Sequence, residues 1–321
     1  MIATGGTIAS KPTESGLAPA ISSQELLSYV PEIADVCKVS TVQPFNLDST
    51  NVHSKHWLEI ARIIEQEYGR YDGFVVTHGT DTMAYTAAAL SYLVQNSPKP
   101  VVLTGSQKSV CLRDTDARQN LFDAFAFCAD DGAGGVHIVF DGKVILGTRA
   151  KKTRTRSYNA FSGIDYPDTA IMRDGVPVYY LNEKPQGKPE FYHRLDENIF
   201  VLKMIPGLKP DIFDYLDRCD GIIIESFGAG GLPNYDNDAF FSRLKGYLEG
   251  GGTAVCTTQV EREGSALDKY EVGRKLLSCG RVLEARSMTL EAAVAKLMWA
   301  LAYKERGVEK LFLTPVRHDI F

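Results

Sequence analysis

The sequence predicts an α/β protein with two domains. Short apolar runs rich in β-branched residues, typical of buried parallel strands, alternate along the chain with segments of helical character. This alternation predicts parallel strands in both halves of the chain. The length of 321 residues exceeds what one hydrophobic core usually holds, so two domains are expected.

Local patterns assign the elements of the first half. Residues 73–77 give the clearest strand signal, and the alanine-rich run that follows them predicts a helix. Trp57, Ile60 and Ile64 repeat at helical spacing, which predicts a helix over 57–68. The other expected elements are strands at 1–3, 39–42 and 101–103, and helices at 22–29, 83–94 and 117–128.

Residues that favour turns predict two hairpins and one loop in the first half of the chain. The pairs Asp141-Gly142 and Asp174-Gly175 each separate two apolar runs. Because Asp-Gly suits the two-residue turn of a β-hairpin, hairpins are expected over 136–146 and 169–181. The polar segment 11–22 contains Pro and Gly and predicts a mobile loop, a candidate lid.

A second α/β pattern follows a polar stretch with two prolines. We take this stretch, 185–198, as a linker between a domain at 1–184 and a domain at 199–321. Four helices and three strands are expected after it. The strands are placed at 199–204, 221–224 and 253–257, and the helices at 211–216, 238–248, 272–277 and 290–303.

Composition narrows the classes of partner. The net charge is −5, and no basic run is longer than 149–156, which argues against nucleic acid or an anionic membrane as the main partner. No apolar run reaches the length of a membrane span. The first residues lack the features of a secretory leader, so a cytoplasmic location is expected.

The cysteines and histidines suggest no metal site. None of the six cysteines forms a C-x-x-C pair, and buried reduced thiols are expected. His53 and His56 are three residues apart, but no other ligand-type residue is near, so a surface role is preferred. We therefore expect neither a metal nor a cofactor.

Polar residues follow the clearest strand. Thr80, Asp81 and Thr82 lie on the turn between the strand at 73–77 and its helix. Ligands of open α/β sheets bind at the carboxyl ends of strands, and a helix N-terminus favours an anion. An ordinary N-cap at Asp81 or Thr82 explains the same residues equally well. His78, in the same stretch, is not expected to be catalytic.

Two further loops of small polar residues follow strands. Residues 4–7 read Thr-Gly-Gly-Thr, where two glycines allow a tight turn and a close approach to a ligand. This is not the dinucleotide-binding fingerprint. The loop is either a plain glycine turn or a site that presents the hydroxyl of Thr4 or Thr7. Residues 48–51 form the third such loop.

Hydroxyl nucleophiles need a base at neutral pH. No serine lies in a G-x-S-x-G motif, and the few histidines do not suggest a Ser-His-Asp triad. A lysine held in its neutral form can activate a threonine instead, with an aspartate to orient it. The basic segment 149–154 could supply that lysine.

These motifs resemble a known family. Residues 4–9 and 77–83, in this order and at this spacing, resemble the two signature motifs of the bacterial-type L-asparaginases. The loop 48–51 and the segment around Lys152 match as well, and the resemblance covers essentially the whole chain. The form of that loop and the missing leader resemble the cytoplasmic type I branch. The resemblance implies a larger N-terminal α/β domain with a mixed sheet and a smaller C-terminal α/β domain with a parallel sheet.

The resemblance also implies a reaction and a site. The reaction is hydrolysis of L-asparagine to L-aspartate and ammonia through an acyl-enzyme, with minor L-glutaminase activity. Thr7 matches the nucleophile, and Thr80, Asp81 and Lys152 match the residues of a second triad that transfers protons. The residues that match substrate-binding positions are Asp48, Ser49, Thr50, Thr80 and Asp81. No cofactor and no metal is implied.

One position departs from the family pattern. The family usually carries a lid tyrosine that bonds to the nucleophile, and Leu17 stands at the aligned position. Leucine cannot relay a proton. We therefore expect Lys152 and Thr80 to carry the proton transfers through water.

The resemblance further implies a homodimer or homotetramer whose sites are completed by the second domain of a neighbouring subunit. Here the candidates are the loop 227–234 and the segment 268–271. Asp268 or Glu271 could contact a substrate amino group, although an ordinary acid at a helix start explains either one somewhat better.

Two other functions compete with this one. The amidase subunit of a tRNA-dependent amidotransferase shares the motifs, but it carries an extra domain before the first motif, which here begins at Thr4. A non-catalytic amino-acid sensor would be expected to lose Thr7, Thr80, Asp81 or Lys152, and all four are present.

Overall fold

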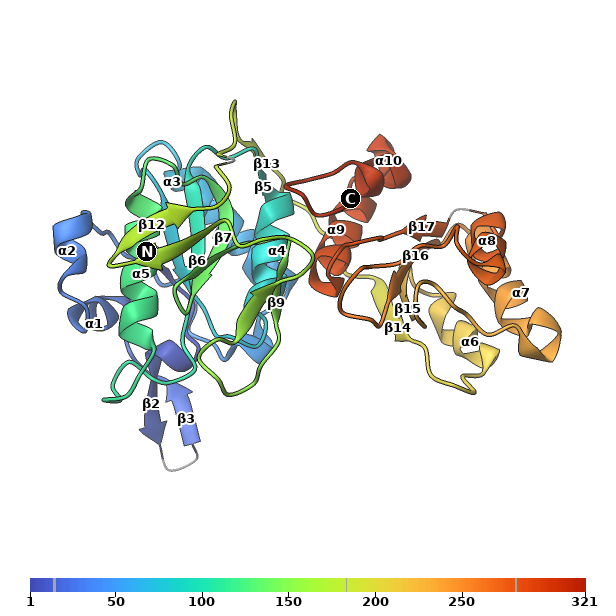
Figure 1. Cartoon of the computed structure of the whole chain (residues 1–321), viewed down its shortest axis with the longest axis horizontal. Coiled ribbons are helices and arrows are strands. Elements are labelled where there is room, and N and C mark those ends of the chain that lie inside the picture. The colour runs from blue at the N-terminus through green and yellow to red at the C-terminus, as the bar shows by residue number, and fades with distance from the viewer. Residues whose placement is uncertain (14–15, 183, 281) are drawn as a thin grey trace. The chain divides into compact units, whose positions relative to one another are not determined.

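The computed structural model describes residues 1–13, 16–182, 184–280 and 282–321 (Figure 1). The chain divides into two compact units, Met1–His193 and Arg194–Phe321. The division falls within the segment 185–198 suggested as a linker. In that segment β13 (Glu190–Phe191) pairs with β5 (Val94–Gln95) of the first unit. The domain limits 1–184 and 199–321 stay a prediction.

The first unit is built on a mixed sheet, as expected, and the sheet has seven strands. Its order is β1-β4-β6-β7-β8-β11-β12. The first four strands are parallel, and each of the last three is antiparallel to its neighbour. The strands are β1 (Ile2–Ala3), β4 (Phe74–Thr77), β6 (Pro100–Thr104), β7 (Gly135–Phe140), β8 (Lys143–Leu146), β11 (Ala170–Arg173) and β12 (Val176–Tyr179).

Both predicted hairpins are confirmed. Strands β7 and β8 join at Asp141 and Gly142, whose φ angles are 51° and 71°. Strands β11 and β12 join at Asp174 and Gly175, with φ of 50° and 74°. Positive φ at both central residues is what a type I′ turn requires, and Asp-Gly adopts it readily.

Helices cover both faces of the parallel strands. Leu121 and Phe125 of one helix, α5, pack with Val75 in a common core. Val76 points to the opposite face and is equally buried, so neither face is left to solvent. The helices of this unit are α1 (Ser23–Ser28), α2 (Ile33–Val36), α3 (Ser54–Glu67), α4 (Met83–Leu93) and α5 (Ala117–Ala129).

Two predictions for the first unit were wrong. The segment 11–22 was expected to be a loop, but β2 (Ser10–Thr13) and β3 (Gly16–Pro19) form an antiparallel hairpin. Lys11 bonds to Glu25 of α1 at 2.6 Å, which anchors the first strand. Residues 14–15 and the Leu17 side chain lie outside the described part, so the lid expectation stays a prediction. The expected strand at 39–42 is reduced to one parallel bridge, from Val42 to Ile2.

The second unit contains a parallel sheet, as expected, and the sheet has four strands. Its strands, in order, are β14 (Ile199–Lys203), β15 (Gly221–Ser226), β16 (Thr253–Thr258) and β17 (Val282–Glu284). The sequence did not predict β17. The helices are α6 (Phe213–Leu216), α7 (Tyr235–Glu249), α8 (Glu271–Ser278), α9 (Leu290–Ala302) and α10 (Val308–Leu313). Asp236, Asn237 and Asp238 have positive φ, so regular helix in α7 begins after them.

A buried ion pair holds the last residues of the second unit. Lys296 Nζ on α9 lies 2.7 Å from Asp319 Oδ2, and both side chains are 0% exposed. The ammonium also donates to Thr314 O, and Asp319 Oδ1 accepts the Val316 N–H. Burial lowers the pKa of Lys296, and Asp319 opposes that shift. Such a pair is stable only while both partners remain.

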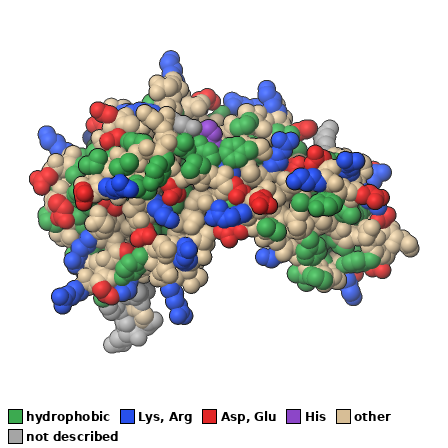
Figure 2. Space-filling view, in the orientation of Figure 1, with side chains coloured by type: hydrophobic (Ala, Val, Ile, Leu, Met, Phe, Trp, Pro, Cys, Tyr) green, Lys and Arg blue, Asp and Glu red, His purple; other side chains and the backbone are tan. Residues whose placement is uncertain are grey.

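Acidic and basic side chains are interspersed on the visible face of each unit (Figure 2). This distribution agrees with the mild net charge of −5. No helix among the described residues is both long and apolar enough to span a membrane.

Replacing Lys296 by methionine is expected to lower the free energy of unfolding by about 3–5 kcal/mol, because Asp319 is left buried without its cation. Urea unfolding measures the change. Lys310→Met, on the exposed surface of α10, is the matched control and is expected to stay within about 0.5 kcal/mol of the parent. Equal effects of both substitutions would contradict the assigned role of the pair.

Candidate functional site

Three loops meet where β1 and β4 end. The loop after β1 contacts the loop after β4, and a Cβ on Gly6 would lie 2.4 Å from Gly79 Cα. The loop at 48–51 closes on the same point, because a Cβ on Gly79 would lie 2.6 Å from Ser49 Oγ. Only glycine fits at either position without moving the backbone. The two glycines therefore bring three polar loops together.

The Thr-Gly-Gly-Thr loop uses its two threonines differently. Thr4 donates from its N–H and its hydroxyl to Thr77 O, at 3.1 and 2.8 Å. Its carbonyl accepts from Leu47 N, so this threonine is part of the sheet edge. Thr7 opens a short 3-10 turn, is half-buried, and its hydroxyl has no hydrogen-bond partner within the described residues. Of the two hydroxyls considered, Thr7 is the one left available.

Lys152 joins residues distant in the sequence. Its Nζ lies 2.7 Å from Thr80 Oγ1 and 2.6 Å from Asp81 Oδ1. Lys152 comes from β9 (Ala150–Lys152), which pairs with β10 (Phe161–Gly163) in a separate two-stranded sheet. The structure therefore brings together three of the four residues predicted to be catalytic.

Thr80, Lys152 and Asp81 differ in their exposure to solvent. Thr80 is 6% exposed, the Lys152 side chain 16% and the Asp81 side chain 58%. An ion pair with one partner in water contributes about 1 kcal/mol or less to stability. The contacts therefore fix the lysine beside Thr80 more than they stabilise the fold.

The loop at 48–51 places the predicted substrate-binding residues. Asp48 precedes a 3-10 turn (Ser49–Asn51), and its Oδ1 accepts from the N–H and the hydroxyl of Thr50 at 2.9 and 2.8 Å. Ser49 is buried. Thr82, the N-cap of α4, donates its hydroxyl to Ser49 O at 2.7 Å. Thr82 thus ties this loop to the turn that carries Thr80 and Asp81.

Sequence reasoning missed Gln107. Thr80 Oγ1 donates to Gln107 Oε1 at 3.3 Å, and Gln107 Nε2 donates to Ser157 O at 3.1 Å. The backbone N–H of Gln107 bonds to the Asp116 carboxylate. A signal was present, because Gln107 lies just beyond β6, the third parallel strand, where the same strand-end rule applies.

Asp116 supports this turn from inside. It is buried, and its carboxylate accepts from the N–H groups of Gln107 and Lys108 and from Asn120 Nδ2. Burial raises the pKa of Asp116, and these hydrogen bonds oppose the rise. The carboxylate holds the turn in one conformation and with it the Gln107 side chain.

The contacts of His78 are structural. The ring is buried, and Nδ1 lies 2.7 Å from Gly79 O, which can only accept, so Nδ1 carries the proton. Nε2 lies 2.9 Å from Thr86 Oγ1, which itself accepts from Trp57 Nε1. Burial lowers the pKa of His78 to about 4, so the neutral ring is the native form.

Of the second-unit candidates, the loop 227–234 is partly buried, with Leu232 in the core, and the segment 268–271 is exposed. In the loop 227–234, Phe227 bridges to Gly231. Asp268 and Glu271 are exposed, and Glu271 is in the first turn of α8, where an acid suits the helix dipole. Their contribution to a neighbouring site stays a prediction.

No group of three or more His, Cys, Asp or Glu residues that could hold a metal occurs in the described residues. His53 is the N-cap of α3, and its N–H donates to His56 Nδ1 at 3.2 Å. The two histidines therefore cap the N-terminus of this helix. All six cysteines are free thiols.

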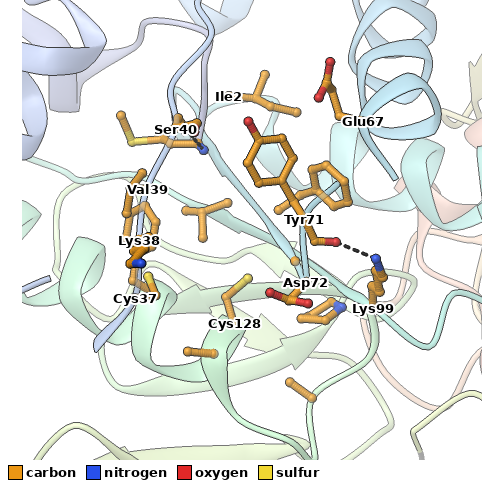
Figure 3. Close-up of a pocket in the computed structure, with 18 of the residues that line it drawn as sticks. Ile2, Cys37, Lys38, Val39, Ser40, Glu67, Tyr71, Asp72, Lys99 and Cys128 are labelled. Carbon is orange, nitrogen blue, oxygen red and sulfur yellow. Dashed lines mark hydrogen bonds between the residues drawn. The ribbon is translucent and has the colours of Figure 1, made fainter. Parts of the chain in front are cut away.

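A large cavity lies at the other ends of the same strands. It opens beside Ile2, Ser40 and Tyr71, with Cys128 at its base (Figure 3). These residues are at the amino ends of β1 and β4, away from the loops that carry Thr7 and Thr80. The cavity is therefore separate from the candidate site.

Family models match nearly the whole chain. The model described as "Asparaginase, N-terminal" matches residues 1–185, and "Glutaminase/Asparaginase C-terminal domain" matches residues 198–312.

Individual proteins are also similar. The chain is 40% identical over 314 residues to an L-asparaginase of Thermococcus kodakarensis, covering 97% of this chain and 94% of that protein. It is 35% identical over 339 residues to a subunit of the glutamyl-tRNA(Gln) amidotransferase of Pyrococcus furiosus, covering 100% and 76%. A crystal structure of L-asparaginase I from Vibrio cholerae superposes with a TM-score of 0.86 at 29% identity, covering 100% and 98%.

Stability is expected to depend on the protonation of His78. The native pKa of about 4 lies below the ordinary 6.5, so the unfolded chain binds the proton first as pH falls. The contribution of the neutral His78 ring to the free energy of unfolding is fully present above pH 6.5 and is lost as the pH falls toward 4. For this difference in pKa the contribution is about 3 kcal/mol. Urea unfolding from pH 7.5 to 4.5 measures the slope.

His78→Gln removes the titrating group and is expected to flatten that slope, whatever its effect at pH 7. The comparison therefore uses the pH dependence of each protein and not its absolute stability. Identical slopes for the parent and the variant would contradict the prediction.

Proposed function

The chain belongs to the asparaginase family, and on that premise we propose that it hydrolyses L-asparagine to L-aspartate and ammonia through a threonine nucleophile. One observation carries the proposal: Lys152 Nζ bonds to both Thr80 Oγ1 and Asp81 Oδ1, beside the loop that holds Thr7. Nothing in the sheet itself requires a lysine to bridge these two side chains.

In the first step, the Thr7 hydroxyl oxygen attacks the side-chain amide carbon of asparagine. The C–N bond breaks, ammonia leaves with the proton that Thr7 gives up, and an ester joins Thr7 to the aspartyl group. Water then hydrolyses the ester, which frees aspartate and restores the hydroxyl. The unpartnered hydroxyl of Thr7, among the described residues, supports this role, because no hydrogen bond must break before attack.

Proton transfer is assigned to Lys152 and Thr80. Thr80 Oγ1 lies between Lys152 Nζ at 2.7 Å and Gln107 Oε1 at 3.3 Å, so its hydroxyl has a defined direction. Asp81 orients the lysine from its other side. We assign Gln107 as a positioning residue that holds Thr80 through the resting state.

The α-amino and α-carboxylate groups of the substrate are assigned to the loops around Gly79. Asp81 and Asp48 offer carboxylate oxygens for the ammonium group, and both side chains are largely exposed. Ser49 offers its hydroxyl for the carboxylate, and Thr50 joins it by exchanging its hydrogen bonds to Asp48 Oδ1 for bonds to the substrate. The chemistry requires only hydroxyls, an amine and backbone donors, so no cofactor or metal is proposed.

Three further properties of the protein are proposed from its family alone. They are minor activity on L-glutamine, a homodimer or homotetramer, and a cytoplasmic location. The Gln/Asn ratio depends on one methylene of pocket depth, which is worth about 1–3 kcal/mol.

A second function is favoured by one finding. The identity to the amidotransferase relative is 35% over the whole chain, so a role in releasing ammonia from glutamine for a partner protein is the alternative. The two functions differ in the free amino acid that is hydrolysed without a partner.

The isolated chain is expected to release ammonia from L-asparagine at least tenfold faster than from L-glutamine, because asparagine is the proposed substrate and one extra methylene costs about 1–3 kcal/mol. A coupled ammonia assay with both amino acids measures the rates. Thr7→Ala is expected to lose about 10³-fold or more in kcat, since the nucleophile is removed. Activity on L-glutamine alone would favour the amidotransferase function, and an active Thr7→Ala variant would exclude Thr7 as nucleophile.

Lys152→Met is expected to reduce kcat by about 10²–10⁴-fold, because proton transfer to and from Thr80 loses its partner. The adjacent Lys151→Met, on the same short strand β9, is the matched control and is expected to retain activity within about threefold of the parent. Turnover and unfolding temperature are measured for both. Near-normal turnover of a folded Lys152→Met protein would refute the assigned base.

A further inference from the structure

The hairpin that carries Lys152 is packed at its base and exposed at its tip. At the base, Phe161 of β10 is buried, and its ring centre lies 5.0 Å from that of Phe140. We define the tip as residues 154–159, and every residue in it is exposed. The tip follows Lys152 by only two residues, so contacts that hold the tip also restrict where the lysine lies.

Two hydrogen bonds join the tip to the rest of the first unit, within the part of the chain that the structure describes. The Tyr158 hydroxyl donates to Asp114 O, and Ser157 O accepts from Gln107 Nε2 at 3.1 Å. The Lys108 ammonium also lies 5.5 Å from the centre of the Tyr158 ring, at the distance of a cation–π contact. All three contacts end on a single stretch of chain.

We name this stretch the bridging segment and define it as residues 107–116. It is held from inside by the buried Asp116 carboxylate, which accepts the N–H groups of Gln107 and Lys108 at 2.9 and 3.0 Å. Thr115 Oγ1 donates back to Lys108 O at 3.1 Å. These bonds lie within the segment itself and give it a fixed backbone shape, so it is a firm support for the tip.

The bridging segment also contacts the loop that carries Thr7. Val110 N donates to Ile8 O at 3.2 Å, and the buried Ser109 hydroxyl donates to Ser10 O. Ile8 directly follows Thr7 in the chain. One segment thus joins the loop of the proposed nucleophile to the hairpin of the proposed base. Proton transfer depends on this relative position, since a displacement of about 1 Å can lower a rate about 100-fold.

We propose that Tyr158 is a positioning residue, whose hydroxyl fastens the tip to the bridging segment and thereby holds the Lys152 amine beside Thr80. The inference rests on the proposed function, in which Lys152 transfers protons. Gln107 supplies the second bond to the tip, but it also bonds to Thr80, so its removal would disturb two contacts at once. Tyr158 forms no hydrogen bond to Thr80 or Asp81 within the described residues, so changing it tests the fastening alone.

The test measures how readily the Lys152 amine reacts with acetic anhydride. Lys151, on the same strand, is the reference within each protein, and mass spectrometry quantifies both acetyl groups. Tyr158→Phe keeps the ring and removes the hydroxyl. It is expected to raise the ratio of Lys152 to Lys151 labelling about 2–10-fold, because the loss of one hydrogen bond shifts a local opening equilibrium by about that factor.

The same variant is expected to lower kcat for L-asparagine about 3–10-fold and to keep KM within about twofold of the parent. The amine acts in proton transfer, whereas the charged groups of the substrate are assigned to the loops around Gly79, which gives this split between kcat and KM. The unfolding temperature is expected to stay within about 3 °C of the parent, since only one exposed bond is lost.

Two control variants separate the hydroxyl from its surroundings. Tyr180→Phe removes the hydroxyl of another exposed tyrosine, and Asp114→Asn ends the ion pair with Lys108 but keeps the backbone carbonyl that accepts the bond. Both controls are expected to keep the labelling ratio and kcat within about twofold of the parent.

Equal labelling ratios in the parent and Tyr158→Phe, or an equal rise in Tyr180→Phe, would overturn the proposal. A raised ratio with unchanged kcat would overturn the positioning role. If the parent hydrolyses neither L-asparagine nor L-glutamine, the proposed function fails, and the labelling ratio still decides whether Tyr158 holds Lys152 in place.

Discussion

The contact between Gly6 and Gly79 is the constraint on which the candidate site depends. A single Cβ at either glycine would collide with backbone or with Ser49, so the two strand-end loops lie as near as polypeptide allows. This closeness lets Thr82 reach Ser49 O. Main-chain packing thus brings the side chains of the site together, and the hydrogen bonds of the hydroxyl groups then fix their orientations.

The threonines around these glycines have separate tasks. Thr4, Thr82 and Thr86 use their hydroxyls within the structure, on Thr77 O, Ser49 O and His78. These bonds hold the strand-end loops and the His78 ring in place, and burial keeps that ring neutral. Thr7 itself has no such bond in the described residues. A site rich in hydroxyls therefore contains few that are chemically available.

Local pattern predicted the long helices, the parallel strands and both Asp-Gly hairpins, because each depends on neighbours in sequence. It failed for β2–β3, which Glu25 anchors through Lys11, and for the three-residue β17, whose partner is distant. The motifs indicated Thr80, Asp81 and Lys152. Gln107 was missed because its bond to Thr80 arises only when the β6 and β4 strand ends are side by side. The cavity at the amino ends of β1 and β4 arises from packing between distant segments, and no sequence pattern predicts it.

Lys152 is carried by β9, which belongs to a two-stranded sheet of its own and not to the seven-stranded one. Two strands alone are marginally stable, so β9 and β10 depend on packing such as that of Phe161 on Phe140 of β7. Opening of β9 and β10 would withdraw the amine from Thr80 while the main sheet stayed intact. The chemistry of the site would then have a lower thermal limit than the fold, set by a sub-global opening of a few residues.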